Sequence, residues 1–155
     1  MSWTLYALLA ALSAAVVGIL SKVGIAGIDA TLATAIRGIS IAVFMGGAAF
    51  MLGKWETLSS ADPKTLLFIV LTGIFGGLSW LWGFIALKIG GDATAVNAID
   101  RLSLVFLLIL AVIFLNETFT WAKFSGILLI ISGTLLVTLK PEQWNDIMNR
   151  VRSLF

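Results

Sequence analysis

Five mostly apolar stretches follow one another along the chain, and each is long enough to cross a bilayer as an α-helix, which takes about 20 residues. They run from about Trp3 to Ser21, Leu32 to Leu52, Pro63 to Lys88, Thr94 to Leu115 and Thr120 to Leu139. The connections between them are short, so neighbouring helices are expected to be antiparallel. This pattern predicts an all-α, polytopic membrane bundle of five helices over residues 1–140.

The composition supports a membrane location and narrows the chemistry. Charged residues are 12% of the 155 positions, whereas soluble domains keep roughly a quarter. The chain has no cysteine and no histidine, which removes thiolate ligands and the commonest general base. A net charge of +2 does not indicate nucleic-acid binding. We therefore expect no enzyme, cofactor or metal. Met1-Ser2-Trp3 also lacks the positive charge of a signal peptide.

Residues 141–155 change to the pattern of an amphipathic helix. Its apolar face comprises Trp144, Ile147, Met148, Val151, Leu154 and Phe155. We expect this segment to lie at the membrane interface and anchor the fifth span, a reading that we favour over partner binding.

Lysine and arginine residues predict the orientation in a cell membrane, because they concentrate on the cytoplasmic side. With five spans the termini lie on opposite sides. The amino-terminal side carries Lys54, Lys64 and Lys123, and the carboxy-terminal side carries Lys22, Arg37, Lys88, Arg101, Lys140, Arg150 and Arg152. The distribution favours an external amino terminus and a cytoplasmic carboxy terminus, and it leaves insertion in both orientations open.

Ionisable residues inside the spans are the main functional candidates, because charge at membrane depth is costly. Arg37 falls in the second stretch, and Asp100 and Arg101 fall in the fourth. Asn97 shares a helical face with Asp100 and Arg101, which lie three and four residues further on, and Ser103 follows Asp100 by three residues. We predict that these five residues bind a substrate carrying both charge signs, such as an amino acid. The alternative is that the charges neutralise each other and hold helices together.

Two lysines on the same side extend this polar cluster. Lys22 ends the first stretch and Lys88 ends the third. They are interpreted as the rim of a vestibule, although lysines at such positions more often extend to the headgroups.

The third stretch carries small residues beside an indole, an arrangement that leaves room for a cavity. Ser79 and Trp80 are therefore assigned to the substrate path, with core packing of Trp80 an equal alternative. The stripe comprises Gly73, Gly76, Gly77, Trp80 and Gly83.

Small residues at four-residue spacing allow close helix contact in membranes. Most such pairs are interpreted as contacts within one chain. Gly126 and Gly133 in the fifth stretch are interpreted as a dimer seam.

The region around the last connection resembles a known family. Phe114-Leu115-Asn116-Glu117-Thr118-Phe119-Thr120, the glycine-spaced helix from Gly126 to Gly133, and Ala86-Leu87-Lys88 are similar to the EamA-type repeat of the drug/metabolite transporter superfamily. The resemblance covers roughly Trp3 to Leu139. It implies a five-helix unit that pairs with an inverted second unit around a central path, here most simply a second copy.

One feature departs from a branch of that superfamily. The small multidrug branch uses a glutamate buried in its first helix for proton coupling, and Trp3 to Ser21 contains no acidic residue. Asp100 is the only acidic residue well inside a predicted span.

Three functions are compatible with a membrane bundle of this kind. The leading one is a small-metabolite transporter that acts as a dimer by alternating access, with the two copies parallel or antiparallel. The alternative is an accessory or structural membrane subunit without transport activity. An intramembrane enzyme ranks last.

Overall fold

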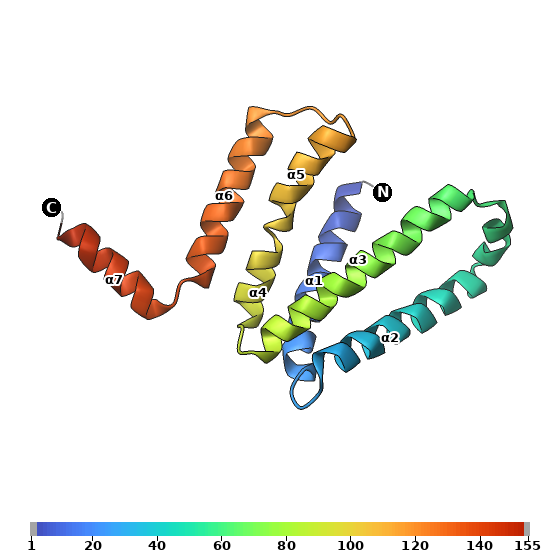
Figure 1. Cartoon of the computed structure of the whole chain (residues 1–155), viewed down its shortest axis with the longest axis horizontal. Helices are drawn as coiled ribbons and strands as arrows, with labels where there is room; N and C mark the ends of the chain where they lie inside the picture. The colour runs from blue at the N-terminus through green and yellow to red at the C-terminus, as the bar shows by residue number, and fades with distance from the viewer. Residues whose placement is uncertain (1–2, 154–155) are drawn as a thin grey trace. The chain divides into compact units, whose positions relative to one another are not determined.

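The computed structural model describes residues 3–153, except the side chains of Pro141 and Val151. Its elements are the α-helices α1 (Trp3–Gly24), α2 (Ala30–Met51), α3 (Pro63–Lys88), α4 (Ala93–Asp100), α5 (Ser103–Phe114), α6 (Trp121–Thr138) and α7 (Pro141–Arg152), with a 3₁₀ helix η1 (Lys54–Ser60) between α2 and α3 (Figure 1). Five segments are long and apolar enough to span a membrane, the fourth comprising α4 and α5 together. The prediction of a five-span, all-α bundle is confirmed.

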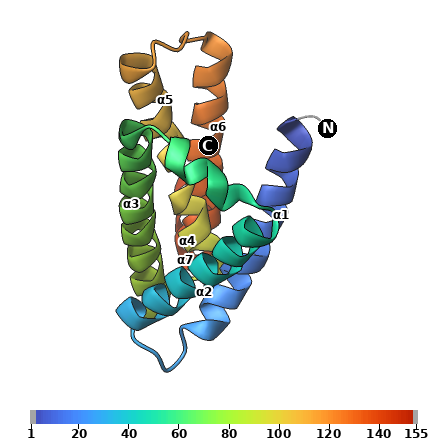
Figure 2. The ribbon, with the colours of Figure 1, turned by 90° about the vertical axis from the view of Figure 1, so that its right-hand side faces the viewer.

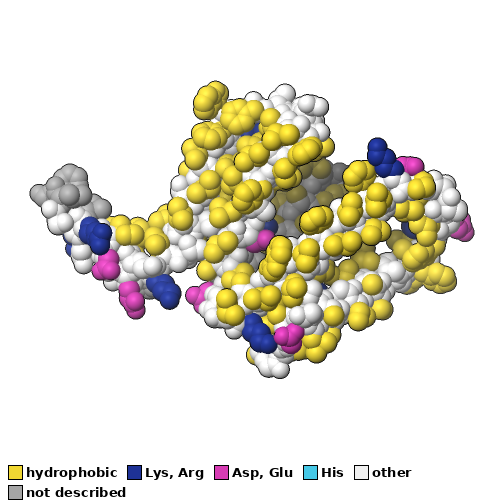
Figure 3. Space-filling view, in the orientation of Figure 1, with side chains coloured by type: hydrophobic (Ala, Val, Ile, Leu, Met, Phe, Trp, Pro, Cys, Tyr) yellow, Lys and Arg dark blue, Asp and Glu magenta, His cyan; other side chains and the backbone are white. Residues whose placement is uncertain are grey.

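The spans expose apolar side chains along most of their length. Leu12, Val43 and Phe75 are each about two-thirds exposed or more (66%, 71% and 69%). Figure 3 shows hydrophobic side chains spread over the visible faces, with charged side chains in small, separate places. Such a surface is unfavourable in water but suits hydrocarbon, in which apolar side chains gain nothing from burial.

The chain divides into two compact units, residues 1–91 and 92–155. In the first unit, α3 packs against both α2 and α1. The three helices meet at the end of the unit that holds the connection between α1 and α2 (Figure 2). This end also carries Lys22, Asp29 and Lys88, which are described below.

Local signals set both ends of α3. At its start, the Asp62 carboxylate accepts a hydrogen bond from the Thr65 backbone N–H, and Pro63 takes the first helical position. At its end, Gly90 has a φ of 111°, and the Gly91 N–H donates to the Ala86 carbonyl at 2.9 Å. This pattern is a Schellman motif, whose left-handed position favours glycine.

The second unit contains a feature that the sequence does not predict. The fourth span is confirmed over Ala93–Phe114, but within it α4 ends at Asp100 and α5 begins at Ser103. Through the interruption the N–H groups bond three residues back instead of four, with Arg101 to Ala98 at 3.2 Å and Leu102 to Ile99 at 2.9 Å. Such a 3₁₀ segment inside a helix marks a hinge or a strained sequence. The sequence around the interruption contains no glycine or proline that would predict it.

A residue of α6 supports the interruption. The Thr134 side chain is buried, and its hydroxyl donates to the Ala98 carbonyl at 3.2 Å. This carbonyl therefore accepts a second bond besides that from the Arg101 N–H. The hydroxyl fixes α6 beside α4, in agreement with the packing of these two helices.

The connection between α5 and α6 is a structured turn. Asn116 has a φ of 52°, and the Lys123 ammonium contacts the Glu117 carboxylate at 3.2 Å. The Thr120 hydroxyl accepts a bond from the Lys123 backbone N–H and so caps α6. The predicted start of the fifth span at about Thr120 is confirmed.

The segment after α6 forms α7. Trp144, Ile147 and Met148 of its predicted apolar face are all exposed. The side chain of Val151 and the whole of Leu154 and Phe155 lie outside the described part of the chain. An interfacial location for residues 141–155 stays a prediction.

Candidate functional site

Arg37 is the most distinctive polar side chain of the first unit. It lies seven residues into α2, roughly 10 Å from the helix start at 1.5 Å per residue. Its guanidinium carbon is 4.2 Å from the centroid of the Trp80 ring and 6.0 Å from that of Phe84. Cations at these distances are attracted to the aromatic face. The structure therefore brings together two of the predicted site residues, Arg37 and Trp80.

A cavity of about 310 Å³ lies beside this stack, between α1, α2 and α3. Arg37 and Ser21 are the polar side chains of its wall. The lining residues are Val17, Leu20, Ser21, Gly24, Ile28, Ala33, Ile36, Arg37 and Phe84. A mostly apolar wall with a few polar groups is typical of small-molecule sites. The sequence did not single out Ser21, which carries no pattern that distinguishes it from other helical serines.

Lys22 binds the end of a neighbouring helix. Its ammonium donates to the Leu87 carbonyl at 3.2 Å and to the Gly91 carbonyl at 2.6 Å. The last carbonyls of a helix lack partners within the helix and attract cations. Lys22 therefore links α1 to the carboxy-terminal end of α3, a structural role that its assignment to a vestibule rim did not anticipate.

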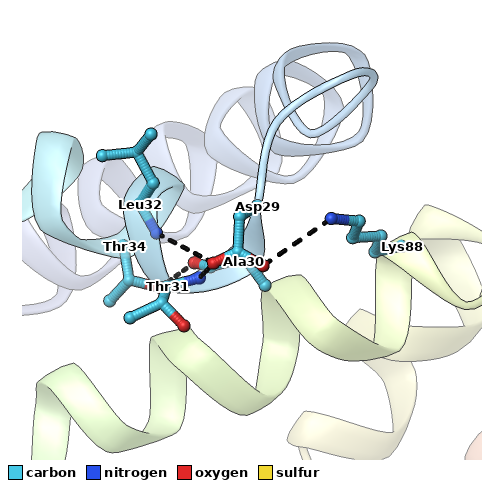
Figure 4. Close-up of polar contacts among 6 residues, drawn as sticks. All are labelled: Asp29, Ala30, Thr31, Leu32, Thr34 and Lys88. Carbon is cyan, nitrogen blue, oxygen red and sulfur yellow. Dashed lines mark hydrogen bonds and ion pairs between the residues drawn. The ribbon is translucent and has the colours of Figure 1, made fainter.

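Lys88 pairs with a residue that the sequence reading missed. Its ammonium lies 3.8 Å from the Asp29 carboxylate, and both side chains are exposed. Asp29 caps α2 by accepting bonds from the backbone N–H groups of Thr31 at 2.8 Å and Leu32 at 3.4 Å (Figure 4). An aspartate directly before an apolar helical run is a common N-cap signal, and it could have identified this residue.

The electrostatics of Asp29 follow from these bonds. The backbone N–H of Thr31, followed by that of Leu32, lowers the pKa of the Asp29 carboxyl. Hydrogen bonds to a carboxylate favour its charged form. Lys88 contributes least, as expected for an exposed pair.

The predicted site residues of the second unit gather at the interruption of the fourth span. Asp100 ends α4, Arg101 follows it, and Ser103 begins α5. All three are exposed. Within the described part of this unit, Asp100 and Arg101 form no ion pair with each other. The Asn97 amide donates to the Ala93 carbonyl at 2.8 Å. Its nitrogen is therefore partly engaged by its own helix.

The remaining candidates are a serine and the glycines. Ser79 is exposed on α3. Gly126 lines a second cavity of about 360 Å³ between α5 and α6. A Cβ atom built at Gly126 or Gly133 meets nothing within 4 Å, and the same is true of the α3 glycines from Gly73 to Gly83. No described helix of the same unit therefore uses these glycines for close approach. The dimer seam stays a prediction.

These features define a multi-pass helical membrane protein with polar groups placed inside its spans. The family of EamA-like transporters matches residues 1–139, and the chain belongs to this family. A protein from Sinorhizobium sp, described as an uncharacterized transporter in the cobO 3′ region, is 38% identical over 136 residues, which are 88% of this chain and 96% of that protein. No solved structure matches.

The comparison confirms the resemblance of the segment around Glu117 and of the glycine-spaced last span to the EamA-type repeat. The chain is accordingly a membrane transporter of the drug/metabolite type. That it has no enzymatic activity stays a prediction.

Proposed function

We propose that the chain is a half-size unit that carries a small polar metabolite and works as a dimer by alternating access. The observation that carries this proposal is the interruption of the fourth span at Arg101 and Leu102, beside Asp100. The interruption indicates where in the chain the substrate would pass.

Arg101 and Leu102 keep right-handed helical dihedrals, and their N–H groups bond three residues back. Such a 3₁₀ segment inside a helix often marks a functional hinge, and transporters commonly place their substrate site where a spanning helix is interrupted. Here a carboxylate and a guanidinium adjoin the break, with Asn97 one turn earlier on α4. A solute with both charge signs, such as an amino acid, matches this pair.

A second copy of the chain is the proposed partner. Inverted repeats around a central site are a common transporter design, and each repeat then supplies half of the path. The Sinorhizobium relative, 96% of which is matched over 136 residues, is also of about this length. Gly126 and Gly133 offer room on α6 for close contact with another helix.

Exchange of labelled amino acids into proteoliposomes tests the proposal. We expect Asp100→Asn to abolish flux while leaving the crosslinked dimer intact. The matched control is Asp146→Asn on α7, which should retain flux. If Asp100→Asn instead disperses the dimer, the chain is an assembly subunit in which the charge of Asp100 at membrane depth needs its partner. Unchanged flux and assembly would remove Asp100 from either role.

A further inference from the structure

We infer that the cavity beside Arg37 binds the oxyanion of a small organic acid whose apolar body fills the rest of the space. The inference goes beyond the proposed transport function, because it adds an anion site at Arg37 to the pair formed by Asp100 and Arg101. The site lies wholly within the first unit.

The aromatic stack holds the guanidinium while leaving its hydrogen-bond donors available. Trp80 lies 4.2 Å from the guanidinium carbon, measured to the ring centroid. The five N–H donors of an arginine lie in the guanidinium plane and point outward from its edge. Stacking on one face therefore does not consume them. An edge of this kind matches a carboxylate through two parallel hydrogen bonds.

The first unit offers Arg37 no counter-ion of its own. Its acidic residues are Asp29, Glu56 and Asp62. Asp29 caps α2 and faces Lys88. Glu56 lies in η1 and Asp62 caps the start of α3, at the end of the unit remote from Arg37. Among the described residues of this unit, Arg37 forms no hydrogen bond or ion pair. A charge at membrane depth usually pairs with another group, and an anionic ligand would satisfy it.

The charge and shape of the cavity select the ligand class. Three cations (Lys22, Arg37 and Lys88) against one carboxylate (Asp29) leave two excess positive charges at this end of the unit. Cationic ligands are therefore disfavoured. Val17, Leu20 and Ile36 form an apolar wall, which favours a hydrocarbon body over a sugar. About 310 Å³ is at the small end of the range for ligand sites.

Binding of 4-methylpentanoate, compared with its uncharged amide, tests the inference. The full chain would be placed in phosphatidylcholine nanodiscs and titrated calorimetrically with each compound. We expect the carboxylate to bind saturably and at least about tenfold more tightly than the amide, because charge-assisted hydrogen bonds are lost in the amide. Equal affinity for the two compounds would overturn the inference without any variant.

Variants then locate the site. Arg37→Met should abolish the preference for the carboxylate, and Arg37→Lys should weaken it, because lysine keeps the charge but not the paired donors. Arg150→Met, the same change at an exposed cation of α7, should leave the preference intact. A carboxylate preference that survives Arg37→Met would place the site elsewhere.

Two other occupants give distinct results. If the headgroup of an anionic lipid fills the site, binding seen in phosphatidylcholine is lost when phosphatidylglycerol is included, and the small-acid assignment falls. If Asp100 neutralises Arg37, the wild type shows no carboxylate preference and Asp100→Asn creates one, which also overturns the inference.

Failure of transport is separable from failure of this site. One outcome is carboxylate binding that depends on Arg37 without flux of any solute in proteoliposomes. This would contradict the transport proposal but support the site. If Arg37→Met leaves the flux of an amino acid unchanged, the site is contradicted and the transport proposal is supported.

Discussion

The guanidinium carbon of Arg37 on α2 lies 4.2 Å from the centroid of the Trp80 ring on α3. This contact joins two helices through a charge that would otherwise be costly at membrane depth. It also orients the only arginine of the cavity wall.

Removing the ring tests the stack. Trp80→Leu should destabilise the fold by about 0.5–2 kcal/mol through the lost cation–π contact, besides its lost packing. Unfolding in mixed micelles with increasing denaturing detergent measures the difference. In the matched control, Trp82→Leu, the replaced ring is 64% exposed, and the effect should be smaller. To separate the charge from the packing, both rings would be replaced in an Arg37→Met background, in which the extra cost of losing Trp80 should shrink.

The Lys22 bridge should be important for stability. Lys22→Met removes a charged donor from two carbonyls at the end of α3, and bonds of this kind contribute about 1.5–3 kcal/mol. We expect lower stability in the same unfolding assay and faster amide exchange in the last turn of α3. Lys64→Met, a lysine-to-methionine change at an exposed position at the start of α3, is the control. Equal behaviour of the two variants would contradict the bridge.

Asp29 should give a pH dependence of defined sign. Its pKa is lowered in the fold by the Thr31 and Leu32 N–H bonds, so its contribution is present above the unfolded pKa of about 3.9 and is lost as pH falls through the folded pKa. In the variant Asp29→Asn, the new amide side chain would still cap the helix but would carry no charge. The wild type should therefore be the more stable at pH 7, and the difference should shrink as pH falls below about 4 and vanish once pH is below the folded pKa. A difference independent of pH would show that the charge contributes nothing.

Thr134 should stabilise the interruption between α4 and α5. Thr134→Val keeps the shape but removes the bond to the Ala98 carbonyl, at a cost of about 0.5–1.5 kcal/mol. Amide exchange from residues 101 to 105 should accelerate. In the control, Thr138→Val, the lost hydroxyl bonds only carbonyls of its own helix, and exchange at the interruption should not change.

The positions of the termini test the orientation inferred from charge. Accessibility of terminal tags in intact cells should show a cytoplasmic carboxy terminus in most molecules. Each tag found on both sides would indicate dual insertion and would support an antiparallel homodimer. A single orientation would require a parallel dimer or an inverted partner of another sequence. An external carboxy terminus in most molecules would contradict the charge rule for this chain.

Features decided by local chemistry were predictable. The caps at Asp62 and Thr120 and the turn around Glu117 depend on residues within one or two turns of each other. The interruption at Arg101 was not predictable, because Asp100-Arg101-Leu102-Ser103 contains no helix breaker. Its support comes from Thr134, which lies 36 residues from Ala98 in the chain.

The sequence by itself determined the membrane class, the five spans and the family, because a bilayer demands long apolar helices and the last connection carries a distinctive turn. Only the tertiary structure decided what each charge touches. Lys22 binds carbonyls 65 and 69 residues away, and Arg37 rests on a ring of another helix. Apolar helices of similar composition can pack in many registers. The partner of a membrane charge therefore depends on packing between helices, which no local pattern encodes.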